Sequence, residues 1–342
     1  MTAEPDLLPT DAIATLLRAG GLVPAHVEPH FVPLTGGVAS DIWRVDAGPR
    51  SFAVKRALPK LRVAADWHAP VSRNAAEADW LRVAARVVPG CVPEILFHDP
   101  ASGLFAMDFL PPDRYPVWKA QLRDGHVDIT FAATVGKTLV RIHAATAGDS
   151  EVAKRFALDD TFHAIRLEPY LEATAGRHPA LAERLFALSR RTLACHQALV
   201  HGDVSPKNIL AGPAGPVLLD AECAWYGDPA FDLAFCLNHL LLKCVWNRAA
   251  TGPLLAAFEA LKTAYLDGPA SGEIEARTAH LLPALLLARI DGKSPVEYIV
   301  RDDDREMVRS VAIPLVARPP GSLDAVRDAW AARLGQTGRS AT

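Results

Sequence analysis

The feature that most constrains the fold is a change in hydrophobic pattern near residue 110. Before this point, apolar residues occur in short strand-like runs separated by turn residues, at 27–34, 41–46, 51–56, 94–98 and 104–109. One segment with helical periodicity, 73–87, lies among these runs. The pattern predicts a small, mostly antiparallel sheet accompanied by a helix.

Helical periodicity dominates the rest of the chain. The predicted helices are 129–145, 180–195, 231–246, 254–266, 273–290, 304–316 and 323–334. A compact non-helical stretch, 198–230, interrupts them with short strand-like runs. We therefore predict an α+β fold with two lobes, a small antiparallel-sheet N-lobe at 1–110 and a larger helical C-lobe at 111–342. A ligand is expected in the cleft between the lobes.

Composition excludes several classes of protein. The net charge is −3 and no block of Lys or Arg occurs, which argues against a nucleic-acid partner bound by bulk charge. The longest apolar stretches, 233–245 and 281–290, are too short and too polar to span a membrane. Five cysteines without a CxxC pair fit a reducing compartment. With no signal-peptide pattern at the N-terminus, we expect a cytoplasmic protein.

The residues that suggest chemistry lie in the non-helical stretch. Asp203 and Asn208 are five residues apart on a predicted loop, and Asp220 ends the next predicted strand. Carboxylate and amide oxygens are ligands that suit Mg²⁺ and do not suit zinc. Phosphoryl transfer uses such a set, with one Asp orienting the attacking hydroxyl and the other groups holding metal on the phosphates. His201 and Asp232 are interpreted as supports of this loop.

The N-lobe offers a matching phosphate site. Gly36 and Gly37 lie between two predicted strands, where glycines let backbone N–H groups approach phosphates, although a Gly-Gly turn also has a plain structural interpretation. Lys55 lies inside an apolar strand, on the face opposite Val54, and is either an edge residue or a phosphate-pairing cation. Glu77, on the following helix, is placed to pair with it.

From about residue 31 to about residue 232 the sequence resembles the aminoglycoside phosphotransferase/choline kinase-like superfamily, which has a protein-kinase-like fold. The shared motifs are VKRAL at 54–58, HGDVSPKNIL at 201–210 and LLDAE at 218–222. Within that superfamily the chain is most similar to the 5-methylthioribose kinases, through the segments at 57–67 and 220–232. It differs from them at Ser205, where that family carries a His. It also differs at Ala288, which precedes Arg289 and leaves that family's arginine pair incomplete in this chain.

The resemblance implies roles for the loop residues. Asp203 would be the catalytic base. Asn208 and Asp220 would bind Mg²⁺, with Glu222 as a further ligand.

The same resemblance implies how ATP is held. Lys55, oriented by Glu77, would contact the phosphates, and Gly36, Gly37 and Ser40 would lie over them. The backbone at the end of the N-lobe would hold adenine, at Met107, Asp108 and Phe109.

Two residues are candidates for contact with the acceptor. Arg289 lies where methylthioribose kinases carry an arginine pair near their substrate. Trp225, close behind the predicted metal carboxylates, could stack on a ligand.

The expected activity is therefore ATP-dependent phosphorylation of a hydroxyl on a small, sugar-like molecule. An aminoglycoside or amino alcohol is the alternative acceptor, and an acidic pocket would favour it. A nucleotide-binding module without transfer activity is the alternative of another class. A protein kinase is disfavoured because only seven residues separate Asp220 from Asp228, which leaves little platform for a peptide. The sequence makes no prediction of oligomeric state.

Overall fold

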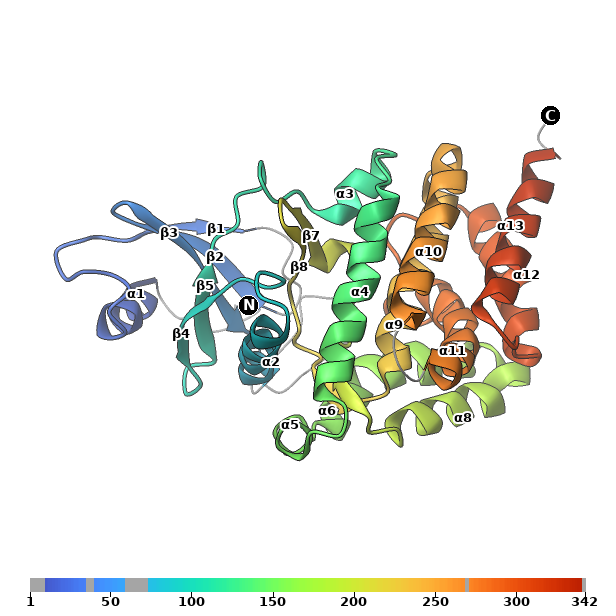
Figure 1. Ribbon diagram of the computed structural model, residues 1–342, viewed down its shortest axis with the longest axis horizontal. Coiled ribbons are helices and arrows are strands. Elements are labelled where there is room, and N and C mark those ends of the chain that lie inside the picture. Colours follow the sequence, from blue (N-terminus) through green and yellow to red (C-terminus); the bar gives the residue numbers. More distant parts are fainter. Residues whose placement is uncertain (1–9, 35–39, 59–72, 268–270, 340–342) are drawn as a thin grey trace, which may run out of the picture.

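The computed structural model describes residues 10–34, 40–58, 73–267 and 271–339. It consists of a sheet-containing lobe and a larger helical lobe, which lie side by side (Figure 1). The predicted two-lobed α+β fold is confirmed. The division into an N-lobe at 1–110 and a C-lobe at 111–342 stays our proposal. The sheet ends at Asp108 and the next helix begins at Trp118.

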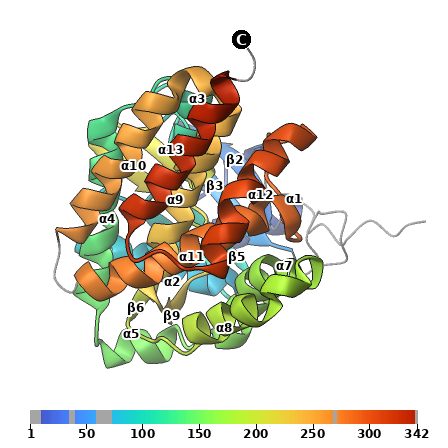
Figure 2. The ribbon, with the colours of Figure 1, turned by 90° about the vertical axis from the view of Figure 1, so that its right-hand side faces the viewer.

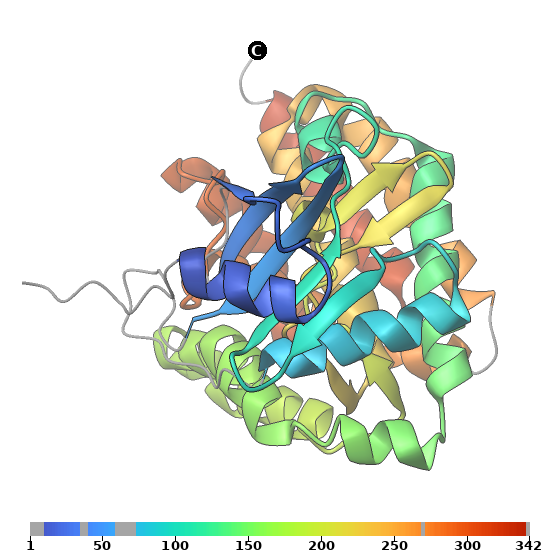
Figure 3. The same cartoon turned by 90° about the vertical axis from the view of Figure 1, so that its left-hand side faces the viewer.

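The smaller lobe is built on one antiparallel sheet with the strand order β1-β2-β3-β5-β4. Its strands are β1 (His30–Pro33), β2 (Ser40–Ala47), β3 (Arg50–Ala57), β4 (Ile95–Asp99) and β5 (Leu104–Asp108). Alternation along β3 sends successive side chains to opposite faces. Helix α1 (Thr10–Ala19) packs on the face that carries Val54, in front of the strands in Figure 3. Helix α2 (Arg73–Val87) lies on the face that carries Lys55, where its Glu77 pairs with that lysine.

The larger lobe packs around helix α9 (Pro229–Trp246), whose residues are buried from Pro229 to Val245. This burial explains why α9 is apolar on every side instead of along one stripe. Figure 2 shows the other long helices of this lobe together. They are α4 (Ile129–Thr146), α8 (Ala182–Leu193), α10 (Thr251–Leu266), α11 (Ser271–Asp291), α12 (Asp302–Ala317) and α13 (Leu323–Arg339). None of the described helices is both long and apolar enough to cross a membrane.

Short elements connect the long helices and carry the loops of interest. Two small antiparallel pairs form, β6 (Ala198–Val200) with β9 (Trp225–Gly227), and β7 (Ile209–Gly212) with β8 (Gly215–Leu218). The remaining pieces are α3 (Trp118–Arg123), α5 (Ser150–Arg155), α6 (Asp159–Phe162), the π-helix η1 (His163–Glu172), α7 (Ala173–Arg177), and the 3₁₀ turns η2 (Pro179–Leu181), η3 (Pro206–Asn208) and η4 (Arg248–Ala250).

Candidate active site

The loop at 201–208 is fixed by a buried carboxylate from the first turn of α9. Asp232 accepts hydrogen bonds from the backbone N–H groups of His201 (2.7 Å) and Gly202 (2.8 Å). His143, on α4, contacts the same carboxylate at 3.1 Å. The carboxylate is fully buried, where hydrogen bonds to a charged group are strong. Two helices therefore set the position of the loop backbone, as predicted for Asp232.

His201 supports the loop from inside. Its Nδ1 accepts the backbone N–H of Asp203 at 3.1 Å, and its Nε2 lies 3.1 Å from the carbonyl of Leu219. This pairing assigns the ring proton to Nε2. Trp80 packs edge-on against the ring, with 4.7 Å between centroids. Burial lowers the pKa of His201. The imidazole is therefore a neutral brace, in agreement with its interpretation as a structural residue.

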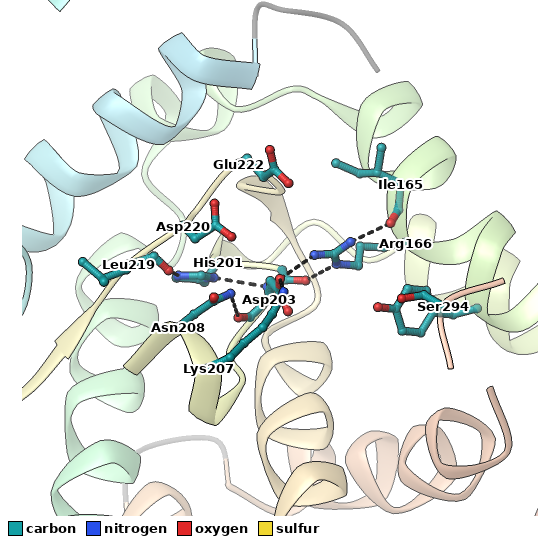
Figure 4. A network of polar contacts seen from close by, with 12 residues as sticks. Ile165, Arg166, His201, Asp203, Lys207, Asn208, Leu219, Asp220, Glu222 and Ser294 are labelled. Carbon is teal, nitrogen blue, oxygen red and sulfur yellow. Dashed lines mark hydrogen bonds and ion pairs between the residues drawn. The ribbon is translucent and has the colours of Figure 1, made fainter. Parts of the chain in front are cut away.

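Asp203 presents its carboxylate to two cations. Its Oδ2 lies 3.0 Å from Arg166 and 3.2 Å from Lys207 (Figure 4). Burial opposes ionisation, but Lys207 and Arg166 outweigh it and lower the pKa of Asp203. Arg166 also donates from Nε to the carbonyl of Gly202 at 2.6 Å. The carboxylate is thus ionised and held in one orientation.

Arg166 is the member of this site that the sequence analysis missed. It lies on the π-helix η1, which contains Pro169. No helix was predicted there, because the wider π-helical turn does not follow the 3.6-residue period and a proline normally indicates a helix end. Segments of π-helix are frequent at functional sites. That local irregularity was the only available signal.

Asn208 connects the loop to the strand that leads to Asp220. Its side-chain Nδ2 donates to the backbone carbonyl of Asp203 at 3.1 Å, and its backbone carbonyl accepts the N–H of Leu219 at 2.9 Å. Asp220 has a φ of 66°, in the left-handed region that non-glycine residues rarely adopt. Such strain persists where the surroundings impose it. In Figure 4 the side chains of Asp220 and Asn208 both lie near His201 and Asp203.

Lys55 links the sheet to this loop. Its ammonium lies 2.7 Å from Oε2 of Glu77 and also pairs with Oδ1 of Asp220. The lysine is 2% exposed and sits on β3, in the middle of the sheet. Burial favours the neutral amine, but Asp220 and Glu77 prevail and raise the pKa of Lys55. The edge-residue interpretation is therefore excluded.

Glu222 lies near Asp220, but a partner already holds it. Its Oε2 contacts Nε of Arg73, at the start of α2, at 3.0 Å. Arg73 in turn donates to the carbonyl of Leu58 at 2.6 Å. Burial and the charge of Asp220 raise the pKa of Glu222. Glu222 thus ties the two lobes together in this structure.

The structure describes four of the other residues that were expected to hold the nucleotide. Ser40 begins β2 and is buried. Met107 and Asp108 end β5, where the backbone N–H of Asp108 donates to the carbonyl of Glu94 at 3.0 Å. The ring of Phe109, just beyond, faces the guanidinium of Arg44 at 5.5 Å. Two further candidates, Gly36 and Gly37, lie outside the described residues.

The assignment of Trp225 to the acceptor is wrong. The side chain is fully buried on β9, its ring stacks on Phe162 with 4.3 Å between centroids, and its indole N–H donates to Asp159. Both the ring and the indole N–H of Trp225 therefore have structural roles. Proximity to Asp220 along the chain gave no information about the direction of the side chain.

Arg289 does lie beside the loop. A small pocket adjoins it, and we call this the loop pocket. Ser205, Pro206 and Lys207 of the loop form one wall, and Lys243 of α9 and Arg289 of α11 line it from the C-lobe. The space in it that is open to a water-sized group is about 20 Å³, a little more than the about 10–15 Å³ that one water needs. It therefore has room for one small polar group, with the rest of a ligand outside it.

The two-lobed architecture, with a lysine on the central strand paired to a helix carboxylate and facing an Asp-bearing loop, defines a protein of the protein-kinase-like fold class. The phosphotransferase enzyme family model matches residues 30–273, and the chain belongs to that family. The predicted membership of the aminoglycoside phosphotransferase/choline kinase-like superfamily is confirmed.

Similar proteins include two curated relatives. A methylthioribose kinase of Pectobacterium atrosepticum is 27% identical over 224 residues, which is 58% of this chain and 56% of the relative. A methylthioribose kinase of Bacillus cereus is 24% identical over 231 residues, which is 60% of this chain and 58% of the relative. The chain thus matches little more than half the length of these relatives.

Solved structures resemble the fold at low identity. A choline/ethanolamine kinase family protein from Mesorhizobium loti is 18% identical, with 96% of this chain and 94% of that chain covered and a TM-score of 0.47. An aminoglycoside phosphotransferase from Alicyclobacillus acidocaldarius is 16% identical, with coverage of 98% and 97% and a TM-score of 0.49.

Proposed function

We propose that this chain transfers the γ-phosphoryl group of ATP to a hydroxyl of a small molecule. The observation that carries the proposal is the ionised Asp203 carboxylate, held by Arg166 and Lys207, next to a Lys55 that is bound by two carboxylates. Phosphoryl transfer depends on positioning and charge stabilisation, and both are built into these contacts.

In this proposal Asp203 is the catalytic residue that accepts the proton of the acceptor hydroxyl. Arg166 and Lys207 are positioning residues, because they hold Oδ2 and thereby fix the direction of the carboxylate. Lys55 contacts the phosphates, and Glu77 orients its ammonium. The backbone around 107–109 contacts adenine, and residues 36, 37 and 40 cover the phosphates.

The oxygen donors fit Mg²⁺. Because Nδ2 of Asn208 donates to the carbonyl of Asp203, its amide oxygen is the donor left for a metal. Asp220 supplies a carboxylate that is about one third exposed. Within the described ranges, no group of three His, Cys, Asp or Glu residues could hold a metal ion. Mg²⁺ binds through one or two protein groups plus phosphates and water, so two donors suffice, and when bound it neutralises phosphate charge.

The acceptor is proposed to be sugar-like. The support is the similarity to proteins named methylthioribose kinase, over 58% and 60% of this chain. An aminoglycoside or amino alcohol is cationic and needs acidic groups around it. The loop pocket is lined instead by Lys119, Lys207, Lys243 and Arg289 against one carboxylate, Glu297. This charge disfavours the cationic alternative.

The test is ADP release with ATP and Mg²⁺ across a panel of sugars, sugar acids, sugar phosphates, amino alcohols and aminoglycosides. Asp203→Asn should lower kcat by about 10²–10⁴-fold and leave ATP affinity unchanged. Asp149→Asn is the matched control, since Asp149 caps α5 far from the loop and Asn caps equally well. Unchanged turnover in Asp203→Asn would exclude the proposed base.

A non-transferring nucleotide-binding module makes a different prediction. It binds ATP with Mg²⁺ but releases no ADP with any acceptor, and Asp203→Asn then changes nothing. Calorimetric ATP binding, measured beside the turnover assay, separates these two functions.

A further inference from the structure

The loop pocket contains a buried lysine without an acidic partner. Lys243 is 1% exposed, and its ammonium lies 3.7 Å from the ring centroid of Tyr298 and 4.2 Å from that of Trp246. Within the part of the chain that the structure describes, Nζ forms neither an ion pair nor a hydrogen bond. A buried charge normally has a partner. Aromatic rings stabilise this ammonium only partly.

Arg289 is the second such cation. It is 8% exposed, and its NH1 donates to the hydroxyls of Tyr170 (3.1 Å) and Ser294 (3.0 Å) and to the carbonyl of Ser294. All of these acceptors are neutral. Its Nε is buried and has no hydrogen-bond partner among the described residues. The arginine therefore lines the pocket with a charge that no carboxylate balances and with an Nε–H that has no acceptor among the described residues.

Two hydroxyls on the walls of the same pocket share this property. Oγ of Ser205, a residue 1% exposed, and the hydroxyl of Tyr298 are buried without a partner in the described ranges. Buried polar atoms are paired in the large majority of cases. Unmatched donors from the loop, from α11 and from the segment that follows α11 thus converge on one small space.

The acidic group of the pocket does not balance these charges. Glu297 pairs with Lys119, and both line the pocket. Lys207 pairs with the Asp203 carboxylate. The charge of Arg289 is therefore left without a carboxylate, and the Lys243 amine beside it has no acidic partner, so the pocket is rich in donors and favours an anion.

We propose that the loop pocket binds an anionic group of the acceptor, so that the acceptor is a small hydroxyl compound that also carries a carboxylate or a phosphate. This inference rests on the phosphotransfer function proposed above. Ser205 and Lys207 belong to the same loop as Asp203, so an anion bound between them and Arg289 brings the rest of a small molecule to the proposed base. Charge-assisted hydrogen bonds are the strongest ones available to such a ligand.

The protonation of Lys243 provides an independent readout. Burial, followed by the charges of Lys119 and Arg289 and partly offset by Glu297, lowers the pKa of Lys243 to about 6. His239 and Lys207 also face this space. An anion favours the charged form and raises the pKa of Lys243. Binding near neutral pH should therefore take up a proton.

The experiment is calorimetric titration of the full chain, with Mg²⁺ and ADP present, by four three-carbon or two-carbon hydroxyl compounds: glycerate, glycerol 3-phosphate, glycerol and ethanolamine. Glycerate or glycerol 3-phosphate should bind, and which of the two binds tighter decides between a carboxylate and a phosphate. Buffers of different ionisation enthalpy report proton uptake. Lys243→Met should weaken anion binding by about tenfold or more.

Matched variants keep the result interpretable. Lys154→Met removes an exposed lysine paired with Glu151 on α5 and should leave anion affinity unchanged. Replacing a buried amine that has no acidic partner by an apolar side chain should also raise the thermal midpoint of Lys243→Met, so loss of binding is distinct from loss of folding. Should Lys243→Met fail to fold, Arg289→Lys tests the same pocket, again with an expected loss of about tenfold.

Three outcomes overturn the inference: neither anion binds, glycerol or ethanolamine binds as tightly as the anions, or Lys243→Met retains full anion affinity. These binding outcomes need no turnover, so they are separate from the proposed activity. Anion binding without release of ADP from ATP in the presence of any acceptor contradicts the phosphotransfer function. ADP release to a neutral or cationic acceptor, unaffected by Lys243→Met, contradicts only the anionic acceptor.

Discussion

Gly202 offers the sharpest test of how the loop is held. It precedes the proposed base and has a φ of 78°, where residues with a Cβ are strained. A Cβ at this position would lie 2.5 Å from the carbonyl oxygen of Cys223 and 2.8 Å from its Cβ. Neither atom is the end of a flexible side chain. Gly202→Ala therefore forces the two backbone segments apart.

The size of the effect follows from these two causes. The left-handed conformation costs a residue other than glycine about 1–2 kcal/mol. Inserting a methyl group into a packed site costs about 1–3 kcal/mol. We expect Gly202→Ala to lose about 2–5 kcal/mol of unfolding free energy, out of about 5–15 kcal/mol for a typical protein.

Gly90→Ala is the control that separates the two causes. Gly90 has a φ of 83°, and none of the described atoms lies within 4 Å of the place of its Cβ. Urea unfolding should show a loss of about 1–2 kcal/mol for Gly90→Ala, and a larger loss for Gly202→Ala. The folded fraction of Gly202→Ala should also lose kcat while it binds ATP, because Lys55 is held by Glu77 and Asp220. Equal losses in the two variants would refute the argument that backbone contact fixes this loop.

Three further predictions concern ion pairs and the core. Lys55→Met should cost about 3–5 kcal/mol by leaving buried carboxylates unpaired, and Lys55→Met with Glu77→Leu should cost less, as urea unfolding would show. Trp225→Phe should lose about 0.5–3 kcal/mol of stability in the same assay and leave the KM for the acceptor unchanged, since Trp225 lies in the core. Burial opposes ionisation of Asp291, but hydrogen bonds led by Arg309 lower its pKa. The ionised carboxylate should therefore contribute about 1–3 kcal/mol to the unfolding free energy. This contribution is present above the unfolded pKa of about 3.9 and is lost as pH falls through the folded pKa. The stability deficit of Asp291→Asn should accordingly shrink in acid unfolding curves, and a deficit that does not depend on pH would contradict the assignment.

Much of the fold could be predicted because long elements repeat their pattern. The predicted helix 129–145 is α4 at Ile129–Thr146, and 231–246 is α9 at Pro229–Trp246. The strand β3, predicted at 51–56, spans Arg50–Ala57. Short elements carry too few residues to show a period. This is why β9, at Trp225–Gly227, was not predicted, and its absence from the prediction led directly to the wrong role for Trp225.

The site was predictable to the extent that its contacts follow from order along the chain. The strand-then-helix order suggested the pairing of Lys55 with Glu77, and the structure shows it. The contact of Arg73 with Glu222 joins residues 149 positions apart, and no pattern in one sequence reveals it. Arg166 reaches Asp203 from the π-helix η1, across 37 positions of the chain. Such contacts depend on tertiary packing, which local propensity does not encode.

The charges on the two sides of the loop explain why one site could both require a metal and prefer an anionic acceptor. On the proposed nucleotide side, Lys55 and Arg73 face the carboxyl groups of Glu77, Asp220 and Glu222, so these cations are already paired and a divalent cation would be needed to neutralise the phosphates of ATP. On the other side the loop pocket holds Arg289 and Lys243 without carboxylate partners, and no free carboxylate among its described lining residues. In the proposed reaction, this difference would favour a metal on the first side and the acceptor's negative group on the second, with the Asp203 carboxylate between them as the proposed base.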